Sequence, residues 1–222
     1  IRDLVRSRGL GDVYKRQVII GGCVRDSIMG IEPHDWDIAT SAQPEEIMEC
    51  FKHYNLMKAG LKHGTVTVII DHEPYEITTY RIDGEYSDHR RPDSVDFTCD
   101  LAEDIMRRDF TINAIAYDGK NIIDLHDGIG DLQKGIIRCV GNANARFRED
   151  PLRILRAIRF AARFGFEIEE STKKAMFDNC DMLRLIATER RQSEFTKTLC
   201  SEHVSTVSYT HLRAHETVLD LV

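Results

Sequence analysis

Two aspartates, Asp35 and Asp37, alternate in the stretch DWDIAT. On a β-strand, residues i and i+2 point to the same face, so a strand here would bring both carboxylates together. Two such carboxylates repel each other unless a cation lies between them, and Mg²⁺ prefers one or two carboxylates together with phosphate oxygens and water. The pattern indicates a metal-dependent phosphoryl-transfer site, with a solvated edge strand as the alternative.

A glycine turn lies immediately upstream of these aspartates. Gly21 and Gly22 follow the β-rich run QVII, and Arg25 adds a cation near the start of the expected helix CVRDSIM. A backbone without Cβ atoms can approach a phosphate closely, and the start of a helix offers free N–H groups. The turn and the aspartates together form a coherent nucleotide site. The alternatives are a plain tight turn and a surface ion pair between Arg25 and Asp26.

The motif RRDFTINA offers further polar side chains that suit a nucleotide. Its arginines, Arg107 and Arg108, could meet a triphosphate, and Asp109 or Asn113 could bond a ribose hydroxyl. The motif follows an expected helix in LAEDIM, and a second helix is expected to start after the break. Taken alone, the pattern favours Asp109 or Thr111 as the cap of that second helix.

Arginines recur along the segment EDPLRILRAIRFAARFGF. Pro151 suits the first position of a helix, so Asp150 is expected to cap that helix. Apolar residues at helical spacing form one face of it. Beside that face runs a stripe of arginines: Arg153, Arg156, Arg159 and Arg163. Such a stripe is usually a solvated face, but arginine also gives planar, forked donation to phosphates and base edges.

An aspartate and an arginine can select a base by facing its Watson–Crick edge. The aspartate accepts from an exocyclic amine, and the arginine donates to the neighbouring acceptor. Cytosine and adenine present that amine, whereas uracil and guanine place a carbonyl there. A pair formed by Asp150 and Arg153 would therefore accept C and A and reject U and G. A closed site that leaves polar groups unpaired can discriminate by a factor of about 10⁴.

The elements that carry these side chains form an N-terminal mixed α/β region. Strands are expected at QVII and DWDIAT, and GTVTVIID and YEITTYRID alternate on either side of HEP, which predicts a β-hairpin. Glu76 lies on this hairpin, either as a third acid beside the aspartates or as an ordinary exposed side chain. SAQPEEIMECF predicts a helix. The polar segment GEYSDHRRPDSVDF predicts a mobile loop, and KNIIDLHDGIGDLQKGIIRCVG predicts short strands and turns.

From Asn142 onward the sequence is helical in character. We therefore expect an α/β head over residues 18–141, with a mixed sheet and helices, and an all-α neck over residues 142–203. The ends, residues 1–17 and 204–222, carry neither a targeting signal nor the periodicity of their neighbours. They resemble peptides translated from sequencing-adapter DNA, and we expect them to be non-native. Ordinary frayed termini are the alternative.

The composition excludes several classes of protein. The chain has 222 residues, 42% of them hydrophobic and 30% charged, which is ordinary for a soluble protein. Its net charge of −7 requires any polyanionic partner to meet a local basic patch. Apolar runs fall short of the roughly 20 residues of a membrane helix, so we expect no membrane partner. The six cysteines form no CxxC pair, which favours reduced thiols in a cytoplasmic protein.

Taken in order, the motifs resemble those of the class II tRNA nucleotidyltransferases, the bacterial CCA-adding enzymes. The resemblance covers essentially all of residues 18–203 and rests on GGCVRD, DWDIAT, HGTVTVI, YEITTYR, RRPDSV, RRDFTINAIAY, EDPLRILRAIRFAARFGF and ERRQSEF. It implies the nucleotidyltransferase fold and the addition of C, C and A to the tRNA 3′ end from CTP and ATP. The 3′-hydroxyl would attack the α-phosphate and release pyrophosphate, with no nucleic-acid template.

The resemblance also implies roles for individual residues. Asp35 and Asp37 would hold Mg²⁺ and serve catalysis. The nucleotide would be bound by a set spread along the chain: Gly22, Arg25, Arg107, Asp109, Asp150, Arg153, Arg156 and Arg159. Within this set, Asp150 and Arg153 would select the base. Further candidates are Gly21, Glu76 and Asn113, and the neck would be supported by the ERxxxE residues Glu189, Arg190 and Glu194.

Several rival functions stay open. A poly(A) polymerase, or a relative that adds only CC or A, would share the fold and the chemistry. A non-catalytic nucleotide- or RNA-binding module predicts that Asp35→Ala and Asp37→Ala leave its function intact, and an inactive fragment is a further alternative. Because the family continues into further helical domains that grip tRNA, we expect this chain to bind CTP and ATP but to add CCA weakly or not at all. Residues 84–93 are expected to reposition between C and A addition.

Overall fold

A computed structural model of the chain describes residues 16–86, 89 and 92–207. The chain divides into two compact units. Unit 1 comprises residues 1–84, 94–108 and 112–128, and unit 2 comprises residues 85–93, 109–111 and 129–222. Most of the two ends that we expect to be non-native therefore lies outside the described residues, as do residues 87–88 and 90–91 of the expected mobile loop.

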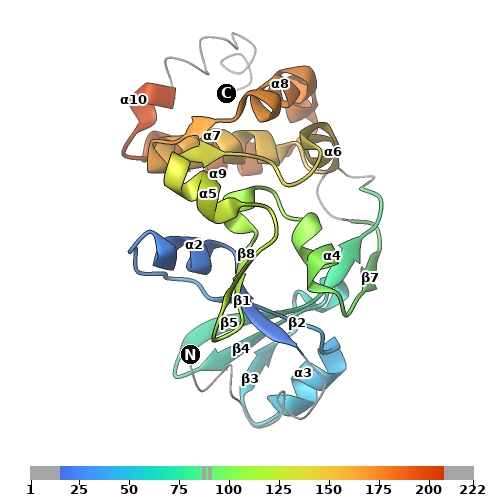
Figure 1. Ribbon diagram of the computed structural model, residues 1–222. Coiled ribbons are helices and arrows are strands. Elements are labelled where there is room, and N and C mark those ends of the chain that lie inside the picture. Colours follow the sequence, from blue (N-terminus) through green and yellow to red (C-terminus); the bar gives the residue numbers. More distant parts are fainter. Residues whose placement is uncertain (1–15, 87–88, 90–91, 208–222) are drawn as a thin grey trace. The chain divides into compact units, whose positions relative to one another are not determined.

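Unit 1 is built on a mixed sheet whose described strands follow the order β3-β4-β5-β2-β1-β8-β9 (Figure 1). These strands are β1 (Gln17–Ile20), β2 (Asp37–Thr40), β3 (Asn55–Met57), β4 (Thr65–Ile70), β5 (Glu73–Thr79), β8 (Ile115–Tyr117) and β9 (Ile122–Asp124). Strands β2 and β5 are parallel, and the other neighbouring pairs are antiparallel. The mixed α/β head and the predicted β4–β5 hairpin are confirmed.

Helices of unit 1 begin at residues suited to that position. The described helices are α2 (Gly22–Ile28), α3 (Pro44–Cys50) and α4 (Leu101–Met106), with a short 3-10 turn η1 (Leu61–His63). Pro44 opens α3, and the side chains of Gln43 and Glu46 form a reciprocal capping box there. Asp100 caps α4 by accepting a hydrogen bond from the backbone N–H of Ala102 at 2.9 Å.

One face of the sheet is covered by α3. The buried cluster on this face contains Ile38, Ile77, Ile47 and Phe51, together with Ala42, Val66 and Val68. Ile38 and Ile77 are register partners on the parallel strands β2 and β5. Because side chains alternate along a strand, the preceding register partners, Asp37 and Glu76, point to the opposite face. The packing of α3 thus leaves the acidic side chains on the other face of the sheet.

The predicted second helix after RRDFTINA is wrong. Residues 111–113 form a 3-10 turn, η2 (Thr111–Asn113), and the chain then enters strand β8 between β1 and β9. Ile115 and Ala116 are both 0% exposed in that position. The two ladders and this burial outweigh the helix propensity of the alanines in NAIAY. Without that helix, Asp109 and Thr111 have no helix to cap, and their side chains serve other contacts.

Three smaller expectations also differ from the structure. Strand β2 begins at Asp37, so Asp35 precedes the strand instead of lying within it. The expected strand-poor segment contains β7 (Val95–Phe97), which pairs with β6 (Arg81–Asp83), because antiparallel pairing compensates for its polar composition. A helix, α5 (Gly128–Lys134), replaces expected turns, and Asp124 accepts from the N–H of Gly128 at 2.8 Å at its start.

Unit 2 is mainly helical, as the sequence predicts. Its described elements include α6 (Ala143–Glu149), α7 (Leu152–Phe164), α8 (Glu170–Asn179), η3 (Cys180–Leu185), α9 (Thr188–Leu199) and α10 (Val204–Val207). A short parallel ladder joins β10 (Ile136–Ile137), in the segment predicted to contain short strands, to β11 (Glu167–Ile168), which was not predicted. Helix α7 ends at Gly165, whose φ of +68° suits glycine. Every helix in the described part of the chain is too short or too polar to cross a bilayer.

We expect Ile77→Ala to destabilise unit 1 by about 2–5 kcal/mol, because it leaves a cavity between the sheet and α3. Ile77 is 1% exposed, whereas Ile82 is 43% exposed, so Ile82→Ala serves as the matched control. The control should change the free energy of unfolding by less than about 0.5 kcal/mol. Urea unfolding followed by fluorescence of Trp36, the single tryptophan of the chain, reports on unit 1. Equal losses in both variants would contradict the proposed core.

Candidate active site

Three carboxylates lie near one another where β2 begins beside the middle of β5. Asp37 opens β2 beside its register partner Glu76, and Asp35 lies two residues before Asp37. The pKa of Asp37 is raised, mainly because the carboxylate loses part of its hydration. The positive charge of Arg108 opposes this rise, and the negative charge of Asp35 adds to it. Loss of hydration also raises the pKa of Glu76, and the charges of Asp37 and Asp35 add to that rise. The negative charge of Asp35 therefore reaches both Asp37 and Glu76.

This acidic group suits a divalent cation. Loss of hydration is the main cause of the raised pKa values of Asp37 and Glu76, and a cation beside these carboxylates would offset the neighbouring negative charges that add to the rise. Within the described residues, no group of three or more acidic, histidine or cysteine side chains converges on a single ion. Mg²⁺ does not need such a set, because it keeps several waters and commonly binds one or two carboxylates plus substrate phosphates. The residues present thus fit a magnesium ion on Asp35 and Asp37, with Glu76 nearby.

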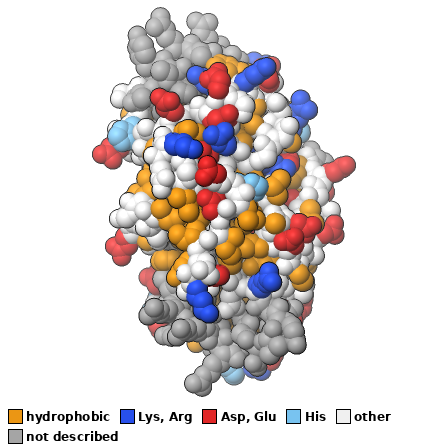
Figure 2. All heavy atoms as spheres, viewed as in Figure 1, with side chains coloured by type: hydrophobic (Ala, Val, Ile, Leu, Met, Phe, Trp, Pro, Cys, Tyr) orange, Lys and Arg blue, Asp and Glu red, His pale blue; other side chains and the backbone are white. Residues whose placement is uncertain are grey.

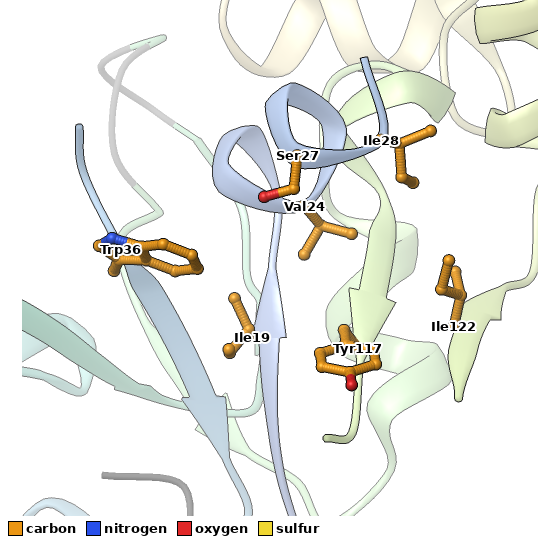
Figure 3. A pocket seen from close by; sticks show the side chains of 7 residues that line it. All are labelled: Ile19, Val24, Ser27, Ile28, Trp36, Tyr117 and Ile122. Carbon is orange, nitrogen blue, oxygen red and sulfur yellow. The ribbon is translucent and has the colours of Figure 1, made fainter. Parts of the chain in front are cut away.

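Trp36, between the two aspartates, belongs to a different environment. Its ring points toward Ile19 and lines an apolar cavity of about 320 Å³, together with Val24, Ser27, Ile28, Tyr117 and Ile122 (Figure 3). Hydrophobic side chains also gather on the viewed surface near α2 (Figure 2). Of the residues that line the cavity, Ile28 and Ile122 are 38% and 49% exposed. The stretch DWD therefore places its acids and its ring in different surroundings.

Gly21 keeps a space open between a cation and a carboxylate. Its φ is +89°, a conformation that side chains rarely adopt. A Cβ atom at this position would lie 3.3 Å from Nη1 of Arg108 and 3.7 Å from Oδ2 of Asp37. The backbone N–H of Gly21 donates to the carbonyl of Ile115 at 3.1 Å, which fixes the turn against β8. Glycine is therefore needed for both its backbone conformation and its lack of volume.

Arg25 lies beneath the glycine turn, only 3% exposed. Its Nε donates to Oδ1 of Asp26 at 2.8 Å, and its Nη1 donates to Oδ1 of Asn113. Its Nη2 is 3.4 Å from the point that a Cβ atom on Gly22 would occupy. The ion pair with Asp26 is thus buried, unlike the surface pair considered from the sequence. The side-chain amide of Asn113 therefore accepts a hydrogen bond from Arg25, a contact that does not require the ribose hydroxyl considered from the sequence.

The two arginines of RRDFTINA differ in position. Nε and Nη2 of Arg107 donate to Oδ1 of Asp104 at 2.9 and 2.8 Å. Arg108 donates through Nη2 to Oδ2 of Asp104 at 3.3 Å, and its Nη1 faces Gly21. Arg108 is also the arginine whose charge lowers the pKa of Asp37. Arg107 therefore lies against Asp104, whereas Arg108, which the motif also offered to a triphosphate but the family resemblance did not single out, faces the glycine turn.

Asp109 belongs to unit 2, where it is 8% exposed and binds Arg156. Its Oδ2 accepts from Nε of Arg156 at 2.9 Å and from Nη2 at 2.5 Å, while its Oδ1 accepts from the N–H of Phe110 at 2.8 Å. The charge of Asp109 is the main cause that raises the pKa of Arg156. The structure thus brings together two residues predicted from separate motifs.

The start of α7 carries the predicted base-selecting pair. Oδ1 of Asp150 accepts from the N–H of Leu152 at 3.1 Å, and Oδ2 accepts from Nη2 of Arg190 at 3.1 Å. Nη1 of Arg153 donates to Oε2 of Glu149 at 2.8 Å. The N-cap residue of α7 is Pro151, not Asp150 as the sequence predicted, because the helix begins at Leu152. Asp150 lies one residue earlier, accepts from the first N–H of the helix and also faces a cation from α9. Each member of the pair is oriented by an oppositely charged neighbour.

The arginine stripe of α7 is not a uniform solvated face. Nε of Arg159 donates to Oε2 of Glu194 at 2.6 Å, and its guanidinium lies 4.2 Å from the ring centroid of Phe160. Arg163 is exposed and lies 4.9 Å from the ring centroid of Phe164. Arg153, Arg156 and Arg159 are partly buried against acids, so the stripe divides into a paired part and an exposed end.

Comparison with known families decides the relationship. Residues 17–138 match the family described as the poly A polymerase head domain. The chain belongs to this poly A polymerase head family. Residues 165–215 of the same chain match a second family, described as a probable RNA- and SrmB-binding site of polymerase A.

Curated relatives of this head-family chain include CCA-adding enzymes. One from Oceanobacillus iheyensis is 52% identical over 187 residues, covering 84% of this chain and 46% of the relative. Another, from Leuconostoc mesenteroides, is 50% identical over 198 residues, covering 88% of this chain and 49% of the relative. The chain thus spans about half the length of these relatives. The resemblance to bacterial CCA-adding enzymes is confirmed.

Solved structures confirm the fold of this member of the head family. The Bacillus stearothermophilus CCA-adding enzyme in complex with CTP has a TM-score of 0.84 and 38% identity, and the match covers 93% of this chain and 50% of that protein. The Thermotoga maritima CCA-adding enzyme complexed with tRNA has a TM-score of 0.77 and 28% identity, covering 95% of this chain and 50% of that protein.

We expect Gly21→Ala to weaken CTP binding by roughly tenfold or more, because its Cβ atom enters the space between Arg108 and Asp37. Gly30→Ala is the matched control, since Gly30 also has a positive φ, +73°, but has no atom of the described residues within 4 Å of the new Cβ. Both variants carry backbone strain of about 1–3 kcal/mol. Calorimetric titration and thermal unfolding separate binding from stability. Equal CTP binding by the two variants would count against the site.

Proposed function

We propose that this chain is the head and neck of a tRNA nucleotidyltransferase that adds C, C and A to the tRNA 3′ end from CTP and ATP. The observation that carries the proposal is that Asp37, beside Asp35 and Glu76, and Arg108 both lie next to the position that a Cβ atom on Gly21 would occupy. The sequence identity to CCA-adding enzymes supports the choice of substrates. We assign the head to residues 18–141 and the neck to residues 142–203.

In the proposed reaction, the 3′-oxygen of tRNA bonds to the α-phosphorus of the nucleotide, and the bond from that phosphorus to the pyrophosphate oxygen breaks. Asp35 and Asp37 would bind Mg²⁺, which when bound supplies activation of the hydroxyl and stabilisation of the departing pyrophosphate. Arg108 would add a cation beside the phosphates. Gly21 would let them approach the backbone, and Arg25 and Asn113 would hold the turn in shape.

Unit 2 would choose the base. Asp150 would accept from the amine of cytosine or adenine, and Arg153 would donate to the adjacent acceptor. Arg190 and Glu149 support this role by orienting the pair from outside. Asp109 and Arg156, which are joined by hydrogen bonds, would bind the nucleotide together, and Arg159 would line the same site. The proposed partners are therefore CTP, ATP and the tRNA 3′ end, with Mg²⁺ as cofactor.

A poly(A) polymerase is the second candidate, because the matched head family carries that description. The two functions differ in their use of CTP. Because this head and neck alone are expected to add CCA weakly or not at all, the natural full-length protein that contains them is supplied with tRNA lacking its CCA end and with CTP, ATP or both. The proposed function predicts that CTP is incorporated first and that ATP follows it once. Incorporation of ATP alone into long tails would favour the poly(A) polymerase.

The variants Asp35→Ala and Asp37→Ala should each lower Mg²⁺-dependent incorporation by about a thousandfold or more, because the metal contributes several kcal/mol to the transition state. Glu73→Ala, an exposed acid on β5, is the matched control and should retain activity. Single-turnover incorporation of labelled CTP measures the effect. Full incorporation activity in either variant would contradict the proposed catalytic role of that aspartate.

Replacing the carboxylate of Asp150 by an amide should relax base selection. Asp150→Asn can donate to the carbonyl of uracil or guanine, so the preference for CTP over UTP should fall by about tenfold or more. Asp178→Asn, at an exposed acid of α8, is the control and should keep the preference. Competitive titrations with the four nucleoside triphosphates measure it. An unchanged preference in Asp150→Asn would remove Asp150 from base selection.

A further inference from the structure

A fully buried carboxylate, Asp104 on α4, lies behind the arginines of RRDFTINA. It is 0% exposed, and the reaction proposed above gives it no part. Burial alone would raise its pKa, but the charges of Arg107 and Arg108 lower the pKa below its ordinary value. Asp104 therefore stays ionised inside unit 1, where a buried charge is stable only through its partners.

The two oxygens of Asp104 serve different partners. Oδ1 accepts from Nε and Nη2 of Arg107 and, at 3.3 Å, from the backbone N–H of Arg81. Oδ2 accepts from Nη2 of Arg108 at 3.3 Å. Oδ1 thus fixes the guanidinium of Arg107, and Oδ2 binds Nη2 of Arg108.

The opposite side of Arg108 faces the candidate active site. Its Nη1 lies 3.3 Å from the point that a Cβ atom on Gly21 would occupy, and Oδ2 of Asp37 lies 3.7 Å from that same point. Its Nε is buried and has no hydrogen-bond partner within the described part of the chain. A guanidinium is planar with donors in a fixed fork, so holding one nitrogen sets the direction of the others.

We propose that Asp104 is a positioning residue that holds Arg108 so that its guanidinium meets the phosphates of the incoming nucleotide at the Gly21 turn. This inference rests on the proposed function, because it assumes that a nucleoside triphosphate occupies that space. Without the rear carboxylate, Arg108 is free to turn toward Asp37, the carboxylate whose charge it already feels. Asp104 would then control nucleotide affinity through Arg108 without touching the nucleotide.

Asp83 provides a matched control inside the same cluster. Its side chain is 6% exposed, it accepts from Nε of Arg81 at 2.9 Å, and it pairs with Nη1 of Arg107 at 3.9 Å. Asp83→Asn and Asp104→Asn both remove a buried negative charge from this group of arginines. The proposal predicts that only Asp104→Asn weakens nucleotide binding, because Asp104 binds Arg108 whereas Asp83 pairs with Arg81 and Arg107.

The test is a double-mutant cycle on the full chain, with CTP affinity measured by calorimetric titration in Mg²⁺ and folding checked by thermal unfolding. Asp104→Asn and Arg108→Ala should each weaken CTP binding by roughly ten- to a hundredfold, the usual worth of a hydrogen bond to a charged group. The double variant should bind within about twofold of Arg108→Ala, because Asp104 acts through Arg108. Asp83→Asn should stay within about threefold of the original chain.

A merely structural role for Asp104 predicts that its loss weakens binding further in the Arg108→Ala background, and that outcome overturns the inference. Normal CTP binding by folded Asp104→Asn also overturns the inference. If Arg108→Ala still binds CTP weakly in that case, the proposed function itself is not contradicted. If Asp104→Asn does not fold, Asp104→Glu keeps the charge but moves it by one methylene, and unchanged affinity in that variant overturns the inference. Failure of the original chain to bind CTP overturns the proposed function and the inference together.

Discussion

Repulsion between like charges is the constraint on which unit 1 depends. The parallel register of β2 and β5 brings Asp37 beside Glu76, and Asp35 adds a further negative charge. Carboxylates this close together remain ionised more readily when a cation lies nearby. Arg108 supplies a positive charge that lowers the pKa of Asp37, and Gly21 brings no side chain between the two. The core under α3 then holds the two strands in this register.

Buried and partly buried arginines in both units are held by acids or amides, and this pairing determines how they can act. Arg25, Arg108, Arg156 and Arg159 each donate to a side-chain oxygen of an acid or an amide. A buried charge that loses its partner is costly, so each pairing restricts the arginine to one orientation. Oriented guanidinium groups bind phosphates and bases with little further ordering, which lowers the entropic cost of binding. The same pairs thus stabilise each unit and prepare it for a ligand.

The sequence predicted the parts of the fold that depend on local signals. Gly21, Gly30 and Pro44 mark turns and a helix start, and the alternation around HEP gives the hairpin. It failed where tertiary contacts decide, because NAIAY becomes a strand only when β1 and β9 flank it. For the site, the choice between Arg107 and Arg108 depends on how Asp104 divides its two oxygens. The spacing of Asp104 and Arg108, at i and i+4 around the end of α4, was the available signal.

The central claim is that Asp35 and Asp37 hold a metal in front of Arg108 and that the nucleotide phosphates lie between them. A crystal structure of this chain with CTP and Mn²⁺, examined for anomalous scattering, tests it most directly. The account predicts a manganese peak within coordination distance of both aspartates and a phosphate oxygen within hydrogen-bond distance of Arg108. A metal bound elsewhere, or phosphates bound to Arg107 while Arg108 faces away, would contradict it.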